Sequence, residues 1–235
     1  MAEQPDLTGI PKLDSALAET QPSLQEYVQA ASQYVLEAEG LTASIKKKAQ
    51  IRLSNVLARV LVNDLEVAEP ALASLYAGEK TVAGALRTVK ADVSEVHELD
   101  GLRLAVELKP VNLAVGRAIW NRFGDIRTFA VNIHLKFPFA VVGGVLTIPT
   151  VEFNQGCAKD VIPLIVRAVD RFTRAGGRKN EGEAAHLLEA IAVVAYDPNR
   201  SLVLPDIPSH ETGLRWEQFV ARLVEAYRSR FEIEG

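Results

Sequence analysis

The sequence predicts one α/β (α+β) domain in which a small central mixed sheet is flanked by helices. Apolar residues recur at helical spacing through the N-terminal part, alternate with polar residues around Asp100-Gly101, and return to helical spacing toward the C-terminus. The 235 residues include 48% hydrophobic and 24% charged residues, the balance of a globular protein with a substantial core. No internal repeat or low-complexity linker divides the chain.

We therefore expect a single domain, 1–235, built from three regions. An N-terminal helical region covers 1–80, a central region covers 85–150, and a C-terminal helical region covers 155–235. Residues 1–21 are polar, contain scattered prolines and are expected to be loosely held.

The N-terminal region is expected to form a layer of helices. Thr42 is a good N-cap for its longest helix, whose apolar residues repeat every three to four positions. Gly40 and Gly78 are expected to end helices. The expected helices cover 22–39, 43–64, 69–77 and, as a short piece, 80–88.

A β-hairpin is predicted in the central region, because Asp-Gly between two runs of alternating apolar residues is a strong hairpin signal. Its strands cover 92–98 and 102–109, and Pro110 closes the second. Leu104, Val106 and Leu108 form an apolar stripe on one face of that second strand.

The opposite face of the hairpin gathers charged side chains. With Asp100-Gly101 as a two-residue loop, Asp92 lies opposite Lys109 and Ser94 lies opposite Glu107, so all four side chains share a face. Buried charges are costly unless they are paired or bind a metal. The residues alone leave two interpretations about equally favoured, a metal site and an exposed salt-bridge network.

Downstream of the hairpin, helices and strands alternate. Gly143-Gly144 favours a bulge or close packing, because no Gly-Lys-Ser/Thr sequence follows that would indicate a phosphate-binding loop. Helices are expected over 112–127 (broken near Gly124), 158–175 (with Pro163 delaying its start), 180–195 and 214–230, and strands over 129–137 and 140–149.

Charge and cysteine content narrow the class of protein. A net charge of −4 does not favour nucleic-acid binding, although a nuclease needs only a local basic lining. The single cysteine, Cys157, excludes a disulfide framework and a cysteine-based zinc site. With no signal peptide or membrane span in the sequence, we expect a cytoplasmic protein. The basic clusters are Lys46–Lys48 with Arg52, then Arg117, Arg122 and Arg127, then Arg171, Arg174, Arg178 and Lys179.

A strand that begins with Asp92, a turn, and a strand that ends in Glu107-Leu108-Lys109 together resemble the core of the PD-(D/E)xK nuclease superfamily. The interval between the two acids falls within the spacing that this superfamily uses. Ala91 stands where the motif has proline, and the following helix has no glutamine at the position that some members use.

The resemblance covers 85–150, as a hairpin, a helix and a further strand, whereas 1–80 and 155–235 match no named subfamily. It implies a restriction-endonuclease-like fold with 85–150 as the catalytic core.

The resemblance also implies roles for the motif residues. Asp92 and Glu107 would bind Mg²⁺, and Lys109 would hold the attacking water and stabilise the transition state. Members often add an acid from an N-terminal helix, for which Asp64, Glu66 and Glu69 are candidates. The candidate DNA contacts are Arg117, Asn121, Arg122, His134, Lys136, Arg178 and Lys179; the strand over 129–137 would turn His134 and Lys136 toward the cleft, and the basic 171–179 segment could clamp DNA.

The resemblance favours a Mg²⁺-dependent DNA endonuclease of type II restriction character. A homodimer would suit a palindromic site, and the size fits a stand-alone catalytic domain. Two alternatives stay open. One is a repair, recombination or defence-accessory nuclease that prefers particular DNA structures or single strands. The other is a nucleic-acid-binding module on the same fold that does not cleave.

Overall fold

A computed structural model describes residues 8–72 and 74–231 of the chain, and its centre is a mixed β-sheet. The strands are β1 (Tyr76–Ala83), β2 (Thr88–His97), β3 (Gly101–Pro110), β4 (Val141–Pro149), β5 (Val151–Asn154), β6 (Cys157–Asp160), β7 (Ala190–Asp197) and β8 (Leu202–Val203). Six of them form one sheet in the order β1-β2-β3-β4-β7-β8, and β5 and β6 form a separate hairpin. Strands β3, β4 and β7 run parallel, and the other neighbours are antiparallel.

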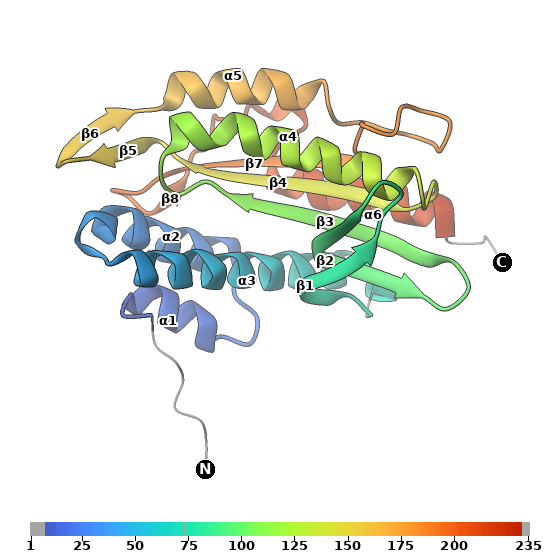
Figure 1. The fold of residues 1–235 in the computed structure, drawn as a ribbon, viewed down its shortest axis with the longest axis horizontal. Helices are drawn as coiled ribbons and strands as arrows, with labels where there is room; N and C mark the ends of the chain where they lie inside the picture. Colours follow the sequence, from blue (N-terminus) through green and yellow to red (C-terminus); the bar gives the residue numbers. More distant parts are fainter. Residues whose placement is uncertain (1–7, 73, 232–235) are drawn as a thin grey trace, which may run out of the picture.

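Helices cover both faces of this sheet, which makes three layers (Figure 1). The helices are α1 (Pro11–Ala18), α2 (Leu24–Glu37), α3 (Ala43–Ala68), α4 (Val115–His134), α5 (Ile162–Thr173) and α6 (Trp216–Phe231), with short 3₁₀ helices at Ala38–Gly40, Pro70–Leu72 and His210–Thr212. Helices α4 and α5 lie on one face, and α1, α2, α3 and α6 pack on the other. The expected class, a mixed sheet flanked by helices, is confirmed. None of the helices in the described ranges is long and apolar enough to cross a membrane.

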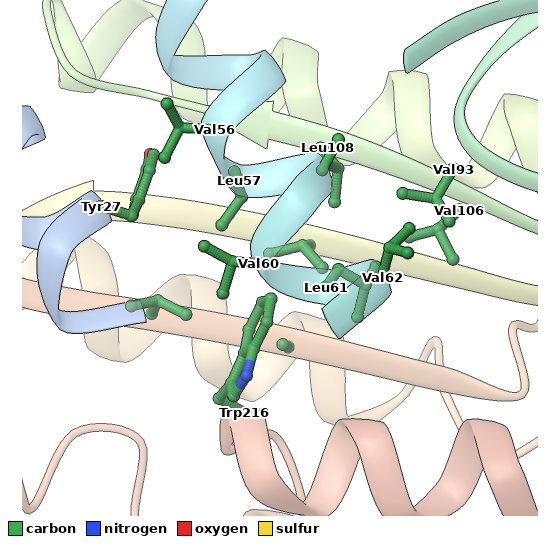
Figure 2. Packing of buried hydrophobic residues seen from close by; sticks show 14 of the residues in the cluster. Tyr27, Val56, Leu57, Val60, Leu61, Val62, Val93, Val106, Leu108 and Trp216 are labelled. Carbon is green, nitrogen blue, oxygen red and sulfur yellow. The ribbon is translucent and has the colours of Figure 1, made fainter. Parts of the chain in front are cut away.

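Two hydrophobic cores lie on the two faces of the sheet. Beneath α3 and α6, the predicted stripe of Leu104, Val106 and Leu108 is buried against Leu57 and Leu61, as Figure 2 shows for several of these side chains. The second core lies beneath α4 and α5. Burial of apolar surface on both faces is the main stabilising contribution to such a sheet.

Helix α3 begins where the sequence predicts, and α2 begins two residues later than expected. Ser23 and Glu26 form a capping box at the start of α2, and the Thr42 hydroxyl accepts a hydrogen bond from the Ile45 N–H at the start of α3. The expectation of a loosely held 1–21 is wrong for α1, where Leu13 and Ala16 are buried. Residues 1–7 lie outside the described part of the chain.

The helices expected over 69–77 and 80–88 are wrong. Pro70–Leu72 form a 3₁₀ turn, β1 covers Tyr76–Ala83, and a turn then leads into β2 at Thr88; residue 73 lies outside the described part of the chain. β1 is an edge strand, and only Val82 of its eight residues is buried. An edge strand with few buried positions lacks the apolar alternation that would have identified it.

Two later segments were also assigned the wrong type. The strand expected over 129–137 is the end of α4, which continues through Gly124 without a break. The helix expected over 180–195 is a loop followed by β7, in which Ala190 to Tyr196 are all buried. A strand covered on both faces has a continuous apolar sequence, which periodicity alone cannot distinguish from a buried helix. Pro163 lies in the first turn of α5, so its expected delay of that helix is confirmed, and β6 precedes it.

The β2–β3 hairpin forms, but its register is shifted by two residues over Val93–Glu95 and by three at Val96 and His97, beyond a bulge. His97 pairs with Gly101, so three residues make the loop, and Ser94 lies opposite Ala105 where Glu107 was expected. Where the shift is two residues the side chains stay on their predicted faces, whereas a shift of one would have reversed them.

Gly143 and Gly144 lie in the regular strand β4, and the expectation of close packing is confirmed. A Cβ atom on Gly144 would meet Ile126 Cγ2 of α4 at 2.5 Å. By contrast, nothing lies within 4 Å of a Cβ atom built on Gly124 in α4.

We predict that Gly144→Ala lowers the free energy of unfolding by about 1–3 kcal/mol, because the added methyl forces α4 away from the sheet. Gly124→Ala is the matched control and should raise it by about 1 kcal/mol through helix propensity. Urea denaturation of both variants tests this, and equal effects of the two substitutions would contradict the packing argument.

Candidate functional site

The predicted site residues lie together in a cleft on the α4 side of the sheet. Asp92 of β2 and Glu107 and Lys109 of β3 line a cavity of about 460 Å³. Glu79 of β1 and Asp125 of α4 line it as well. The cleft therefore gathers four carboxylates from four different elements, together with three cationic side chains, those of Arg87, Lys90 and Lys109.

The cleft exists because β2 leaves β3 at Asp92. Backbone pairing of the two strands ends at Val93 opposite Val106. Beyond this point the Asp92 carboxylate takes the place of a backbone acceptor, and its Oδ2 receives the Leu108 N–H at 2.7 Å. Val93 belongs to the core beneath α3, whereas Ala91 belongs to the core beneath α4. Residues two apart on a regular strand share a face, so β2 turns at Asp92.

The tip of the β1–β2 hairpin is fixed on α4, and this holds the turned part of β2 over the cleft. The backbone carbonyl of Asn132 accepts the Ala85 N–H at 2.9 Å, and its side-chain oxygen accepts those of Leu86 and Arg87 at 3.2 and 3.1 Å. Asn132 itself is buried, and its side-chain nitrogen donates to the Thr128 carbonyl, so the amide that receives these bonds is held in place. They give the cleft a wall made of β2 and α4.

The carboxylates of the cleft raise one another's pKa. Glu107 is only 7% exposed, and burial raises its pKa to about 7, with Asp92 and Asp125 adding to the effect against the opposing influence of Lys109. Burial likewise raises the pKa of Asp92, helped by Glu79 and opposed by the Leu108 N–H and Lys109. The Lys109 ammonium forms an ion pair with Glu107. At Asp92 and Glu107, whose pKa values burial raises, a bound cation would favour the charged carboxylates.

The donor set of the cleft fits Mg²⁺, which usually takes one or two protein carboxylates and fills its other positions with water and phosphate oxygens. Asp92 and Glu107 supply two such carboxylates on adjacent strands. No group of three or more His, Cys, Asp or Glu side chains in 8–72 and 74–231 is arranged to hold a metal by itself. The cleft can therefore supply part of a coordination sphere that substrate and water would complete.

The candidate acids from the N-terminal region do not reach the cleft. Asp64 accepts a hydrogen bond from Trp216 Nε1 at 2.6 Å, and Glu69 is buried in an ion pair with Arg228 of α6. Glu66 lies on α3, across the sheet from α4, and it does not line the cleft. The acids that do line the cleft, Glu79 and Asp125, were missed.

The candidate DNA contacts on α4 are exposed near the cleft. Arg117, Asn121 and Arg122 all lie on the surface of this helix. Arg122 forms an ion pair with Asp125 at 2.8 Å, which places its guanidinium at the cleft margin. These three residues therefore stay candidates for contact with a polyanion.

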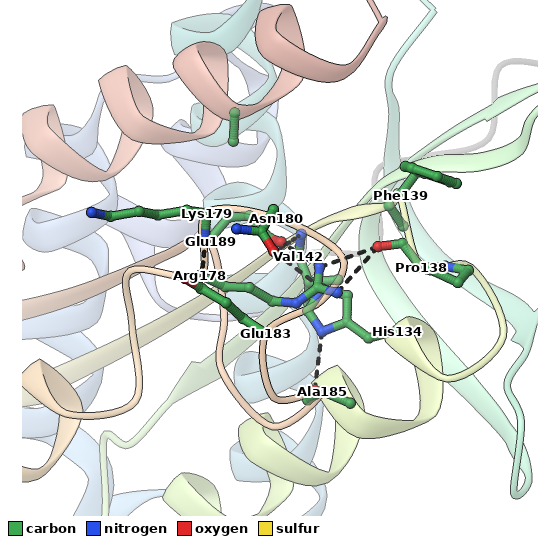
Figure 3. Close-up of polar contacts among 12 residues, drawn as sticks. His134, Pro138, Phe139, Val142, Arg178, Lys179, Asn180, Glu183, Ala185 and Glu189 are labelled. Atoms are coloured by element: carbon green, nitrogen blue, oxygen red, sulfur yellow. Dashed lines mark hydrogen bonds and ion pairs between the residues drawn. The ribbon is translucent and has the colours of Figure 1, made fainter.

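His134 and Arg178, by contrast, are buried in a charged network and cannot contact DNA. Both bond to Glu189, at 3.1 Å from His134 Nε2 and 2.9 Å from Arg178 Nη1, and Arg230 of α6 adds a bond of 2.7 Å. Figure 3 shows this cluster, which also receives the Val142 N–H at 2.8 Å. Burial alone would raise the pKa of Glu189, but these donors hold it at about 2.

The two remaining candidates, Lys136 and Lys179, are exposed but lie away from the cleft. Lys136 follows the end of α4, with its ammonium 5.8 Å from the ring of Phe137. Lys179 lies in the loop between α5 and β7, where its N–H donates to Glu183 at 2.8 Å. The strand that would have turned His134 and Lys136 toward the cleft does not exist.

Comparison with known proteins does not identify this chain. No family model matches the sequence, and neither the curated proteins nor the solved structures contain a significant match.

The raised pKa of Glu107 makes the stability of the metal-free protein depend on pH. Between pH 4.5 and 7 the folded chain holds a proton that the unfolded chain releases, so stability falls as pH rises through this window. We expect a loss of about 3 kcal/mol from this group. Glu107→Gln should flatten the profile, measured by urea denaturation between pH 5 and 8, whereas Glu98→Gln in the exposed hairpin loop should leave it unchanged. Parallel profiles for wild type and Glu107→Gln would contradict this assignment.

The buried network predicts a large effect of removing its single carboxylate. Glu189→Ala would leave the charges of Arg178 and Arg230 buried without their partner, and we expect a loss of about 3–5 kcal/mol of unfolding free energy. Glu183→Ala, on the exposed loop before β7, should cost less than about 1 kcal/mol. Similar midpoints for the two variants in thermal denaturation would show that the network contributes little.

Proposed function

We propose that this protein is a Mg²⁺-dependent endonuclease that hydrolyses phosphodiester bonds in DNA. The observation that carries the proposal is the convergence of Asp92, Glu107 and Lys109 in one cleft, at the point where β2 and β3 separate. The succession of hairpin, helix α4 and parallel strand β4 also agrees with the resemblance that the motif suggested.

The roles of the residues follow from their chemistry. Asp92 and Glu107 would hold the metal, and their carboxylates suit it because both are shielded from bulk water. When bound there, Mg²⁺ supplies a Lewis acid that polarises the phosphate and lowers the pKa of water. Glu107 must be deprotonated to bind a cation, so affinity should rise with pH through about 7.

Lys109 is placed to act on the reacting phosphate. Its ammonium lies beside the Glu107 carboxylate and is about one-fifth exposed, so it is accessible from the cleft. A cation held at this position can orient the attacking water and stabilise the charge that develops on the phosphate oxygens. Sequence-specific cleavage of duplex DNA by a homodimer is the finer form of this proposal, and it rests on the resemblance.

We predict that Lys109→Ala lowers Mg²⁺-dependent cleavage of plasmid and phage DNA by at least about 100-fold, the usual contribution of such a group. Lys159→Ala in the exposed strand β6 is the matched control and should cleave at the wild-type rate. Circular dichroism should show that both variants fold.

The products distinguish the forms of the proposal. Discrete bands would support sequence-specific cleavage, and a Mg²⁺-dependent smear would support a nuclease without sequence preference. Cleavage by Lys109→Ala at the wild-type rate, or no cleavage of duplex, nicked and single-stranded DNA by the wild type, would overturn the proposal.

A further inference from the structure

A second charged cavity lies on the other flank of α4. It has a volume of about 360 Å³ and is bordered by Phe123 and Arg127 of α4 and by Arg171, Arg174 and Ala175, at and just beyond the end of α5. We call it the α4–α5 groove. Its residues on α4 alternate along the helix with Asp125 and Phe129, which line the first cleft. Residues two apart on a helix point in nearly opposite directions, so α4 separates the two cavities.

Aromatic rings hold the guanidinium groups of this groove in place. The Arg171 guanidinium lies 4.3 Å from the centroid of the Trp120 ring, and that of Arg127 lies 5.7 Å from the centroid of Phe123. Phe123 is fixed by an edge-to-face contact with Phe172, at 4.8 Å between centroids. A guanidinium stacked on a ring keeps its N–H edge available to an acceptor.

The positive charge of the groove is poorly balanced. Arg127 and Arg171 have no carboxylate partner among the residues that the structure describes. Arg174 pairs with Asp170, but both side chains are about 70% exposed, and such a pair contributes little. The Nε atom of Arg127 is buried without a hydrogen-bond partner. The net charge of the chain is −4, yet three arginines gather around this cavity, where their like charges repel one another.

We propose that the α4–α5 groove is a binding site for phosphate groups. Planar guanidinium donors match the oxygen pairs of a phosphate, and an anion would offset the repulsion between the arginines. The groove has no carboxylate pair, so it binds and does not cleave. The phosphate can come from a DNA backbone or from a small polyphosphate.

The DNA form of this inference rests on the proposed function. A helix is about 10–12 Å wide, so a strand that leaves the first cleft needs only to cross α4 to bring its next phosphates to the groove. The groove would then hold the DNA while the cleft acts on it. The polyphosphate form does not depend on any nuclease activity.

The test measures binding, without cleavage, by fluorescence anisotropy of a labelled 20-base-pair DNA in EDTA. Arg127→Gln/Arg171→Gln should weaken binding at least tenfold and reduce the slope of log affinity against log salt concentration by about 2, because two phosphate contacts are lost. Arg174→Gln removes a mostly exposed side chain that cannot disturb the core, and it should reduce the slope by about 1. Arg200→Gln, in the exposed turn before β8, should behave as wild type.

Direct titration with inorganic tripolyphosphate, followed by calorimetry without DNA, separates the two sources of phosphate. Tripolyphosphate binding that is lost in the double variant, with DNA affinity unchanged, assigns the groove to a small polyphosphate. Loss of DNA affinity in the variants assigns it to DNA, whatever the cleavage assay gives. If the double variant and Arg174→Gln bind both DNA and tripolyphosphate as tightly as Arg200→Gln does, the groove is not a phosphate site.

Discussion

The hydrogen bond from the Leu108 N–H to the Asp92 carboxylate is the interaction on which the rest of the site depends. It satisfies the Leu108 N–H, which would otherwise need a backbone acceptor on the neighbouring strand. Strand β2 can therefore turn away from β3, while β3 continues into the parallel part of the sheet. The opening that results forms the cleft beside Glu107 and Lys109 on the α4 side. Anchoring of the hairpin tip on Asn132 then fixes the width of the opening.

Much of the fold was predictable where local chemistry decides it. Helices α2 and α3 follow their capping residues, and the β2–β3 hairpin follows its Asp-Gly turn. Strands β1 and β7 were not predictable, for two different reasons. β1 pairs with its neighbour β2, but it is an edge strand with only Val82 buried, so it lacks the apolar alternation that indicates a strand. β7 pairs with β4, which lies beyond α5 in the sequence, and its continuous apolar residues also suit a buried helix.

The site residues on the hairpin were predictable from the sequence, whereas those that depend on tertiary contacts were not. The sequence places Asp92, Glu107 and Lys109 on one face although the predicted register is wrong. Strand faces repeat every two residues, and the error in the part of the hairpin next to Asp92 is two residues. Glu79 and Asp125 come from elements that only the tertiary fold brings to the cleft. Nothing in the sequence indicates that Arg178 is buried, because an arginine in a loop is usually exposed, whereas Arg178 is 4% exposed. Its burial depends on Glu189 and could not be inferred without that contact.

The charged network around Glu189 also has a consequence for the order in which the chain can fold. Glu189 and Arg230 are 41 residues apart, and ribosomes add about 5–20 residues per second. For roughly 2–8 seconds after Glu189 is made, its carboxylate lacks one of its two arginines. During that interval strands β1 to β4 can already pair, but the apolar face that α6 later covers stays open to water. The nascent chain therefore passes through a stage in which a nearly complete sheet needs protection from other chains.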